Sequence, residues 1–68
     1  MSDDHKKGKS KPPEGSFAKA AEDALDKYER WREHNGNPLQ NGDVIGVDFH
    51  VKYGNSLSEY IAILRTND

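Results

Sequence analysis

The sequence contains no cysteine among its 68 residues. Disulfides and thiolate metal sites are therefore excluded, although domains of this size commonly depend on such cross-links or on a partner. No apolar run approaches the roughly 18–20 residues of a membrane-spanning helix. The lysine-containing N-terminus also lacks the apolar segment of a signal peptide. We therefore expect a soluble, cytoplasmic, single-domain protein that gains stability by associating with another chain.

An excess of charge of one sign is also absent. The chain has 10 basic and 12 acidic side chains, for a net charge of −2 at pH 7, which argues against a general nucleic-acid binder. The first 15 residues contain a single apolar residue, Met1. Such a segment cannot bury enough apolar surface to become ordered, so residues 1–15 are predicted to form a disordered arm. We interpret the arm as a solubilising tail. The alternative is contact with phosphate or an acidic partner through Lys6, Lys7, Lys9 and Lys11.

An amphipathic helix is predicted over residues 17–34. Ser16 can cap its N-terminus. The apolar residues that follow are spaced by three and four, and they are Phe17, Ala20, Ala21, Ala24, Leu25, Tyr28 and Trp31. The outer face holds two acid–base pairs in the favourable order, Asp23–Lys27 and Asp26–Arg30. Asn35-Gly36 provides a left-handed cap and Pro38 prevents continuation, so the helix is expected to end near residue 34.

A β-hairpin is predicted after the helix, with strands at about residues 44–53 and 57–66. From Val44 the apolar residues recur at every second position, and Gly54-Asn55 is a suitable two-residue loop. In that register Phe49 lies opposite Tyr60. The face toward the helix contains Ile45, Val47, Phe49, Val51, Tyr53, Tyr60, Ala62 and Leu64. The predicted fold class is therefore α+β, with a small αββ domain over residues 16–68.

The second face of this hairpin carries more apolar residues than a face in contact with water needs. Leu57, Ile61 and Ile63 lie there, together with His50 and Glu59. One helix cannot cover both faces of two strands, so an apolar strip and two sheet edges would stay exposed. We therefore expect a homo-oligomer or a complex with a partner protein, with these five residues at the interface.

His50 and Glu59 are expected to lie opposite each other, with Asp48 two residues along the strand. A histidine–carboxylate pair can act in acid–base catalysis or contribute to a metal site. A solvent-facing pair of charges is the more common arrangement. The sequence contains no HxH, HExxH, GxGxxG or GxxxxGK[ST] motif. No metal site and no enzymatic activity are predicted.

Trp31 lies near Tyr28 on the apolar stripe, at the last turn of the predicted helix. An aromatic side chain in this place more often closes the end of a core, but it can also stack on a planar ligand such as a flavin. Trp31 and Tyr28 are therefore candidate cofactor-binding residues, although no cofactor is predicted.

The segment SFAKAAEDALDKYER resembles the opening of the helix in dodecins, which are small flavoproteins. The matching residues are Ser16, Phe17, Ala20, Ala21, Ala24 and Leu25, and SEYIAILR is similar in placement to the last dodecin strand. The resemblance implies a sheet wrapped on a helix, subunits joined edge to edge, and flavin held by an aromatic side chain. Dodecins begin with a strand and carry their flavin-stacking tryptophan at the start of the strand after the helix. This chain has HKKGKSKPPEG and Leu39–Val44 in those places, so no binding residue is carried over.

The main functional hypothesis is a small non-enzymatic interaction module. It would bind itself or a partner protein through the edge and second face of the hairpin, by strand addition or by a helix laid over the face. One alternative is a carrier of a flavin-like planar cofactor. The other is a nucleic-acid accessory protein that uses the lysine-rich arm.

Overall fold

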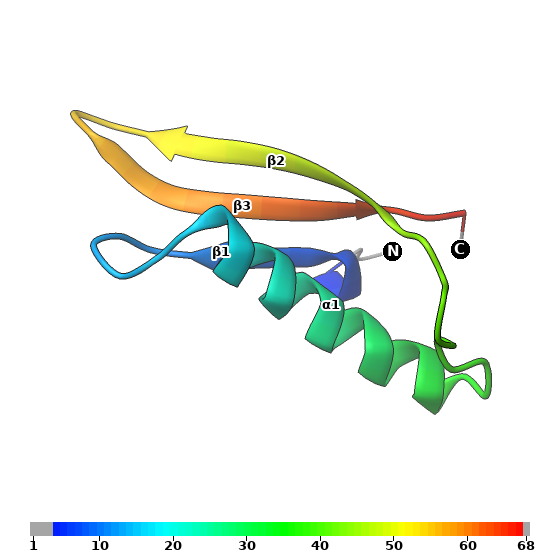
Figure 1. Ribbon diagram of the computed structural model, residues 1–68. Coiled ribbons are helices and arrows are strands. Elements are labelled where there is room, and N and C mark those ends of the chain that lie inside the picture. The colour runs from blue at the N-terminus through cyan, green and yellow to red at the C-terminus, as the bar shows by residue number, and fades with distance from the viewer. Residues whose placement is uncertain (1–3, 68) are drawn as a thin grey trace.

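One α-helix packs on a three-stranded antiparallel sheet in the computed structural model, which describes residues 4–67 (Figure 1). The elements are a short 3-10 helix η1 (Asp4–Lys6), strand β1 (Lys7–Ser10), helix α1 (Phe17–His34), strand β2 (Gly46–Tyr53) and strand β3 (Leu57–Arg65). The strands are ordered β1-β3-β2 across the sheet. The α+β class predicted from the sequence is confirmed.

Helix α1 begins and ends where its local signals predict. The Ser16 hydroxyl accepts a hydrogen bond from the backbone N–H of Lys19 at 3.1 Å, which satisfies one of the free N–H groups of the first turn. Beyond the Asn35 C-cap, Gly36 has a φ of 77°, a left-handed conformation that is accessible to glycine at little cost. The two predicted ion pairs also form, at 3.1 Å for Asp23–Lys27 and 2.5 Å for Asp26–Arg30.

The N-terminal segment differs from the predicted disordered arm. Residues 7–10 form β1, which pairs with β3 from Lys7 opposite Ile63 to Ser10 opposite Tyr60. The segment orders without large apolar side chains because Gly8 brings its backbone directly onto α1. A Cβ atom built on Gly8 would lie less than 3.0 Å from backbone atoms of Ala20 and Ala24. Residues 1–3 of the predicted arm, and residue 68 of the predicted domain, lie outside the described residues.

The core lies between α1 and the β1–β3 part of the sheet. Its fully buried members are Ala20, Ala24, Tyr28, Ala62 and Leu64. The helix packs mainly against β1 and β3, and in Figure 1 strand β2 lies on the side of the sheet farthest from the helix. The small side chains on the helix stripe therefore allow α1 to pack closely on β1. Most residues of β2 lie outside this core.

The hairpin has the predicted faces but a different register. Val47 lies opposite Leu64, and Phe49 lies opposite Ala62 instead of Tyr60. An irregularity between Lys52 and Tyr53, together with a three-residue connection, shifts the pairing by two residues. Because side chains alternate with a period of two, this shift keeps the residues paired with positions 46–52 on their predicted faces. Tyr53 and Leu57, which were predicted on opposite faces, lie opposite each other across the strands at the irregularity.

The shifted register separates one predicted pair. His50 lies opposite Ile61, and Glu59 lies opposite Lys52. The expected cross-strand pair of His50 and Glu59 is therefore wrong. The register differs because three residues, and not the two of the Gly54-Asn55 signal, connect the strands.

Candidate interaction surface

The two edges of the sheet differ in how their backbone groups are satisfied. At the β1 edge, the backbone N–H of Lys9 donates to the Asp23 carboxylate at 3.1 Å. The Lys27 ammonium donates to the backbone carbonyl of Lys7, also at 3.1 Å. Asp23 and Lys27 are themselves paired on α1. Side chains of the helix therefore occupy the hydrogen-bonding positions that another strand would need.

Asp23 is held in its charged form by these contacts. Burial raises the pKa of Asp23, but the backbone hydrogen bond from Lys9 and the hydrogen bond and charge of Lys27 outweigh it. The pKa of the carboxyl group therefore lies below its usual value. A charged Asp23 at neutral pH is a strong acceptor for the Lys9 N–H, so the β1 edge is closed under ordinary conditions.

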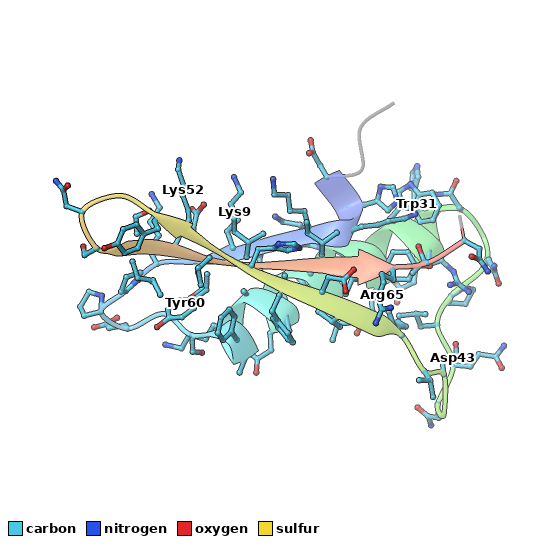
Figure 2. All side chains as sticks on the ribbon, turned by 90° about the horizontal axis from the view of Figure 1, so that it is seen from above. Lys9, Trp31, Asp43, Lys52, Tyr60 and Arg65 are labelled. Carbon is cyan, nitrogen blue, oxygen red and sulfur yellow. The ribbon has the colours of Figure 1, made fainter. Side chains whose placement is uncertain are left out.

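The β2 edge has no such cover within residues 4–67. β2 is the outer strand of the sheet, and Figure 2 looks onto this edge, where the β2 ribbon lies in front of the other strands and no ribbon crosses it. All residues from Phe49 to Tyr53 are exposed. An outer strand directs alternate N–H and C=O groups away from the sheet, which makes it a template for pairing with another chain.

An apolar surface adjoins this open edge on the side of the sheet that faces the helix. Phe49, Val51 and Tyr53 of β2 are 50%, 48% and 74% exposed, and Phe17 at the start of α1 is 40% exposed. The Phe17 ring makes edge-to-face contacts with Phe49 at 5.2 Å and with Tyr60 at 4.9 Å between ring centroids. We call these five residues the apolar patch. They were predicted to lie on the surfaces where the helix and the hairpin pack together, but α1 lies over β1 and β3 and leaves them only partly covered.

The second face of the sheet is less open than predicted. Of the expected interface residues on β3, Leu57, Glu59, Ile61 and Ile63 are all half-buried, and His50 on β2 is exposed. Strand β1 places Lys9 beside Ile61 and Lys7 beside Ile63. The alkyl stems of lysine can cover apolar neighbours while their ammonium groups stay in water. The exposed apolar surface on the second face is therefore smaller than the one predicted for a hairpin without a third strand.

The two candidate ligand-stacking aromatics are in contact with a side chain of the same protein. The His5 ring stacks on Trp31 at 4.1 Å with an interplanar angle of 12°, and it lies 6.2 Å from the Tyr28 ring. Tyr28 is fully buried. His5 thus occupies the place beside Trp31 where a planar ligand was considered. The sequence offered no signal for this contact, because His5 precedes the helix by more than ten residues and belongs to a segment predicted to be disordered.

A hollow of about 480 Å³ lies between the end of α1 and the C-terminal end of the sheet. Its lining includes Tyr28, Arg32, Leu39, Asp43, Arg65 and Thr66. Arg32 donates to the Tyr28 hydroxyl at 3.0 Å and to the Asn37 carbonyl, so its guanidinium is tied to the protein. The hollow combines charges of both signs and gives no indication of one ligand class.

The four lysines considered for phosphate contact do not form a single surface. Lys6 is buried at 9% exposure in η1, and Lys7 is half-buried. Lys9 points to the second face of the sheet, as Figure 2 shows, and Lys11 is exposed in the connection to α1. Ordering of β1 therefore removes the flexible lysine cluster on which the nucleic-acid alternative depends.

The fold and this surface define a small α+β protein with one closed and one open sheet edge. Among residues 4–67, no group of three histidine, aspartate or glutamate side chains could hold a metal ion. Within the same range, α1 is not apolar enough to cross a membrane. Comparison of the chain with protein-family models, curated proteins and solved structures finds no match. The functional argument therefore depends on the surface itself.

Proposed function

We propose that this protein is a non-enzymatic interaction module that self-associates through the β2 edge and the apolar patch beside it. The observation that carries the proposal is the contrast between the two sheet edges. Asp23 and Lys27 satisfy outward backbone groups of β1, whereas β2 is an exposed outer strand. Open edges are normally protected in proteins that remain monomeric, so an edge left open beside apolar side chains favours strand addition.

The apolar patch supplies the free energy that backbone pairing alone would not. Complete burial of a Val, Leu, Ile, Phe or Met side chain contributes about 1.5–3 kcal/mol relative to exposure. Phe49 and Val51 are about half exposed, so covering each would contribute about 1 kcal/mol. Tyr53, at 74% exposed, offers a further large surface with a hydroxyl that can stay in water. These residues replace Leu57, Ile61 and Ile63 as the proposed anchors.

A pair of matched substitutions tests the proposal. Val51 belongs to the apolar patch on β2, whereas Val44 is 95% exposed and precedes the strand. Val51→Lys places a charge in the proposed interface and is expected to shift the protein toward monomer. Val44→Lys makes the same chemical change outside the interface and is expected to leave association unchanged.

Sedimentation equilibrium and light scattering of the full chain at micromolar concentrations measure the outcome. Far-UV circular dichroism checks that both variants keep the helix content of the parent protein. A parent protein that stays at 7.7 kDa at every concentration would contradict self-association. Equal weakening by both substitutions would contradict the location of the interface.

A further inference from the structure

We infer that the occupant of the β2 edge is a second copy of this chain, paired antiparallel with Asp48 opposite Lys52 of the copy. This inference rests on the proposed self-association and adds its geometry. Besides Gly46, the second-face residues of β2 are Asp48, His50 and Lys52, an acid and a base equally spaced about a histidine. An antiparallel pair of identical strands related by a two-fold axis exchanges the two ends. An axis at His50 therefore brings each Asp48 opposite a Lys52.

Neighbouring registers lose this complementarity. Registers that keep both sets of side chains on their faces differ by steps of two residues. A shift in one direction sets Asp48 opposite His50 of the copy and leaves Lys52 opposite Gly46. A shift in the other sets Lys52 opposite His50 and leaves Asp48 opposite Gly54. Only the register centred on His50 matches opposite charges twice, and opposite-charge pairs directly across two strands are stabilising.

Charges already present in each subunit extend the match across the sheet. Lys52 lies opposite Glu59 within its own chain, and the Asp48 carboxylate is 3.2 Å from the Arg65 guanidinium. The proposed register therefore aligns Glu59 and Lys52 of one copy with Asp48 and Arg65 of the other. The signs alternate along this row, and the two-fold axis repeats it. Networks of this kind contribute more than isolated surface pairs do.

The face toward the helices is compatible with the same register. It places Phe49 opposite Val51 of the second copy, and Val47 opposite Tyr53. Both are pairs of an aromatic and a β-branched residue, which pack favourably across antiparallel strands. The apolar patches of the two copies then join into one surface, and the two sheets become one six-stranded sheet.

Charge reversal tests the register with two variants. Each is expected to dimerise weakly alone, and the two are expected to form a heterodimer when mixed. Asp48→Lys makes the second face of β2 wholly basic at these two positions, and Lys52→Asp makes it wholly acidic. Each variant alone would face two repulsive pairs, and its dimer dissociation constant is expected to rise at least about tenfold. An equimolar mixture restores two attractive pairs, so a heterodimer is expected with affinity near that of the parent.

Native mass spectrometry resolves the mixed dimer by mass, and sedimentation equilibrium gives its dissociation constant. Mixing cannot repair damage within a chain, such as the lost contact of Asp48 with Arg65, so recovery identifies pairing between chains. If the parent protein dimerises but both variants dimerise equally well alone, the register is wrong and the proposed function stands. If the variants weaken dimerisation but their mixture gives no heterodimer, the register is also wrong. If the parent protein is monomeric throughout, the proposed function fails together with the inference.

Discussion

The substitution Gly8→Ala tests the docking of β1 on α1, which determines both edges of the sheet. A Cβ atom at Gly8 would lie less than 3.0 Å from three backbone atoms of the helix, the carbonyl oxygen of Ala20 and the N and Cα atoms of Ala24. Ordinary contacts of a Cβ atom begin at 3.4 Å. Because the facing atoms are backbone, no change of side-chain rotamer can make room, and β1 must move away from α1 as a whole.

The expected loss of stability follows from that movement. Separating the two elements by about 1 Å would lengthen the 3.1 Å hydrogen bond from Lys9 to Asp23 beyond bonding distance, at a cost of about 1 kcal/mol. Poorer packing over Ala20 and Ala24 adds to this, so we expect a total of about 3 kcal/mol, at the upper end for overpacked sites. Without the steric conflict, Gly→Ala would leave stability unchanged or raise it slightly, because it restricts the unfolded chain.

Urea unfolding at one fixed protein concentration, followed by Trp31 fluorescence and far-UV circular dichroism, measures the effect. Gly54→Ala is the matched control, because a Cβ atom at Gly54 has no neighbour within 4 Å, and it is expected to change stability by less than about 0.5 kcal/mol. Equal stability of the two variants would refute the packing of β1 on the helix. The closed β1 edge would then also have to be abandoned.

Two further predictions concern other contacts of the N-terminal segment. Asp23→Asn is expected to cost about 1 kcal/mol at pH 7, because it weakens the acceptor for Lys9, while Asp26→Asn removes an exposed ion pair and costs less than about 0.5 kcal/mol. The pKa of Asp23 is lowered in the folded state. The contribution of the Asp23 carboxylate to the free energy of unfolding is therefore complete above its ordinary pKa and is lost as the pH falls through its folded-state pKa. The urea midpoint of Asp23→Asn should accordingly decline less steeply than that of the parent protein between about pH 5 and 2. His5→Ala is expected to lower the free energy of unfolding by about 1 kcal/mol and to alter the fluorescence emission of Trp31. His34→Ala is the control, because His34 is exposed, and it should change stability and emission little. Unchanged emission in His5→Ala would contradict the stacking of His5 on Trp31.

The features that local chemistry specifies could be predicted from the sequence. The bounds of α1 follow from the Ser16 cap and the glycine at position 36, and both signals act within one helical turn. The faces of the hairpin follow from alternation, which is insensitive to a shift of two residues. The register was not predictable in this way, because it depends on the irregularity between Lys52 and Tyr53. A local irregularity of this kind leaves no mark in the pattern of apolar residues.

Strand β1 could not be identified from alternation or apolar content, because Lys7–Ser10 reads Lys-Gly-Lys-Ser. Its stability comes from the close approach of Gly8 to the helix and from hydrogen bonds at its edge, neither of which requires an apolar side chain. A signal was present in the helix itself. Ala20 and Ala24 are spaced by four on the buried stripe, and paired small residues of this kind allow another backbone to approach closely. They indicate that something without a side chain packs there.

The missing strand also explains why the interface proposed from the structure differs from the one predicted from the sequence. A hairpin alone would have two open edges and would centre its helix over both strands, so its uncovered apolar residues would be those of the second face. Once β1 pairs with β3, the helix lies over β1 and β3, and β2 extends beyond it. The half-covered residues become Phe49, Val51 and Tyr53, on the face toward the helix. The packing of β1 on α1 therefore closes one edge of the sheet and also leaves β2 uncovered by the helix. For this reason the charge-reversal experiment tests pairing at the β2 edge.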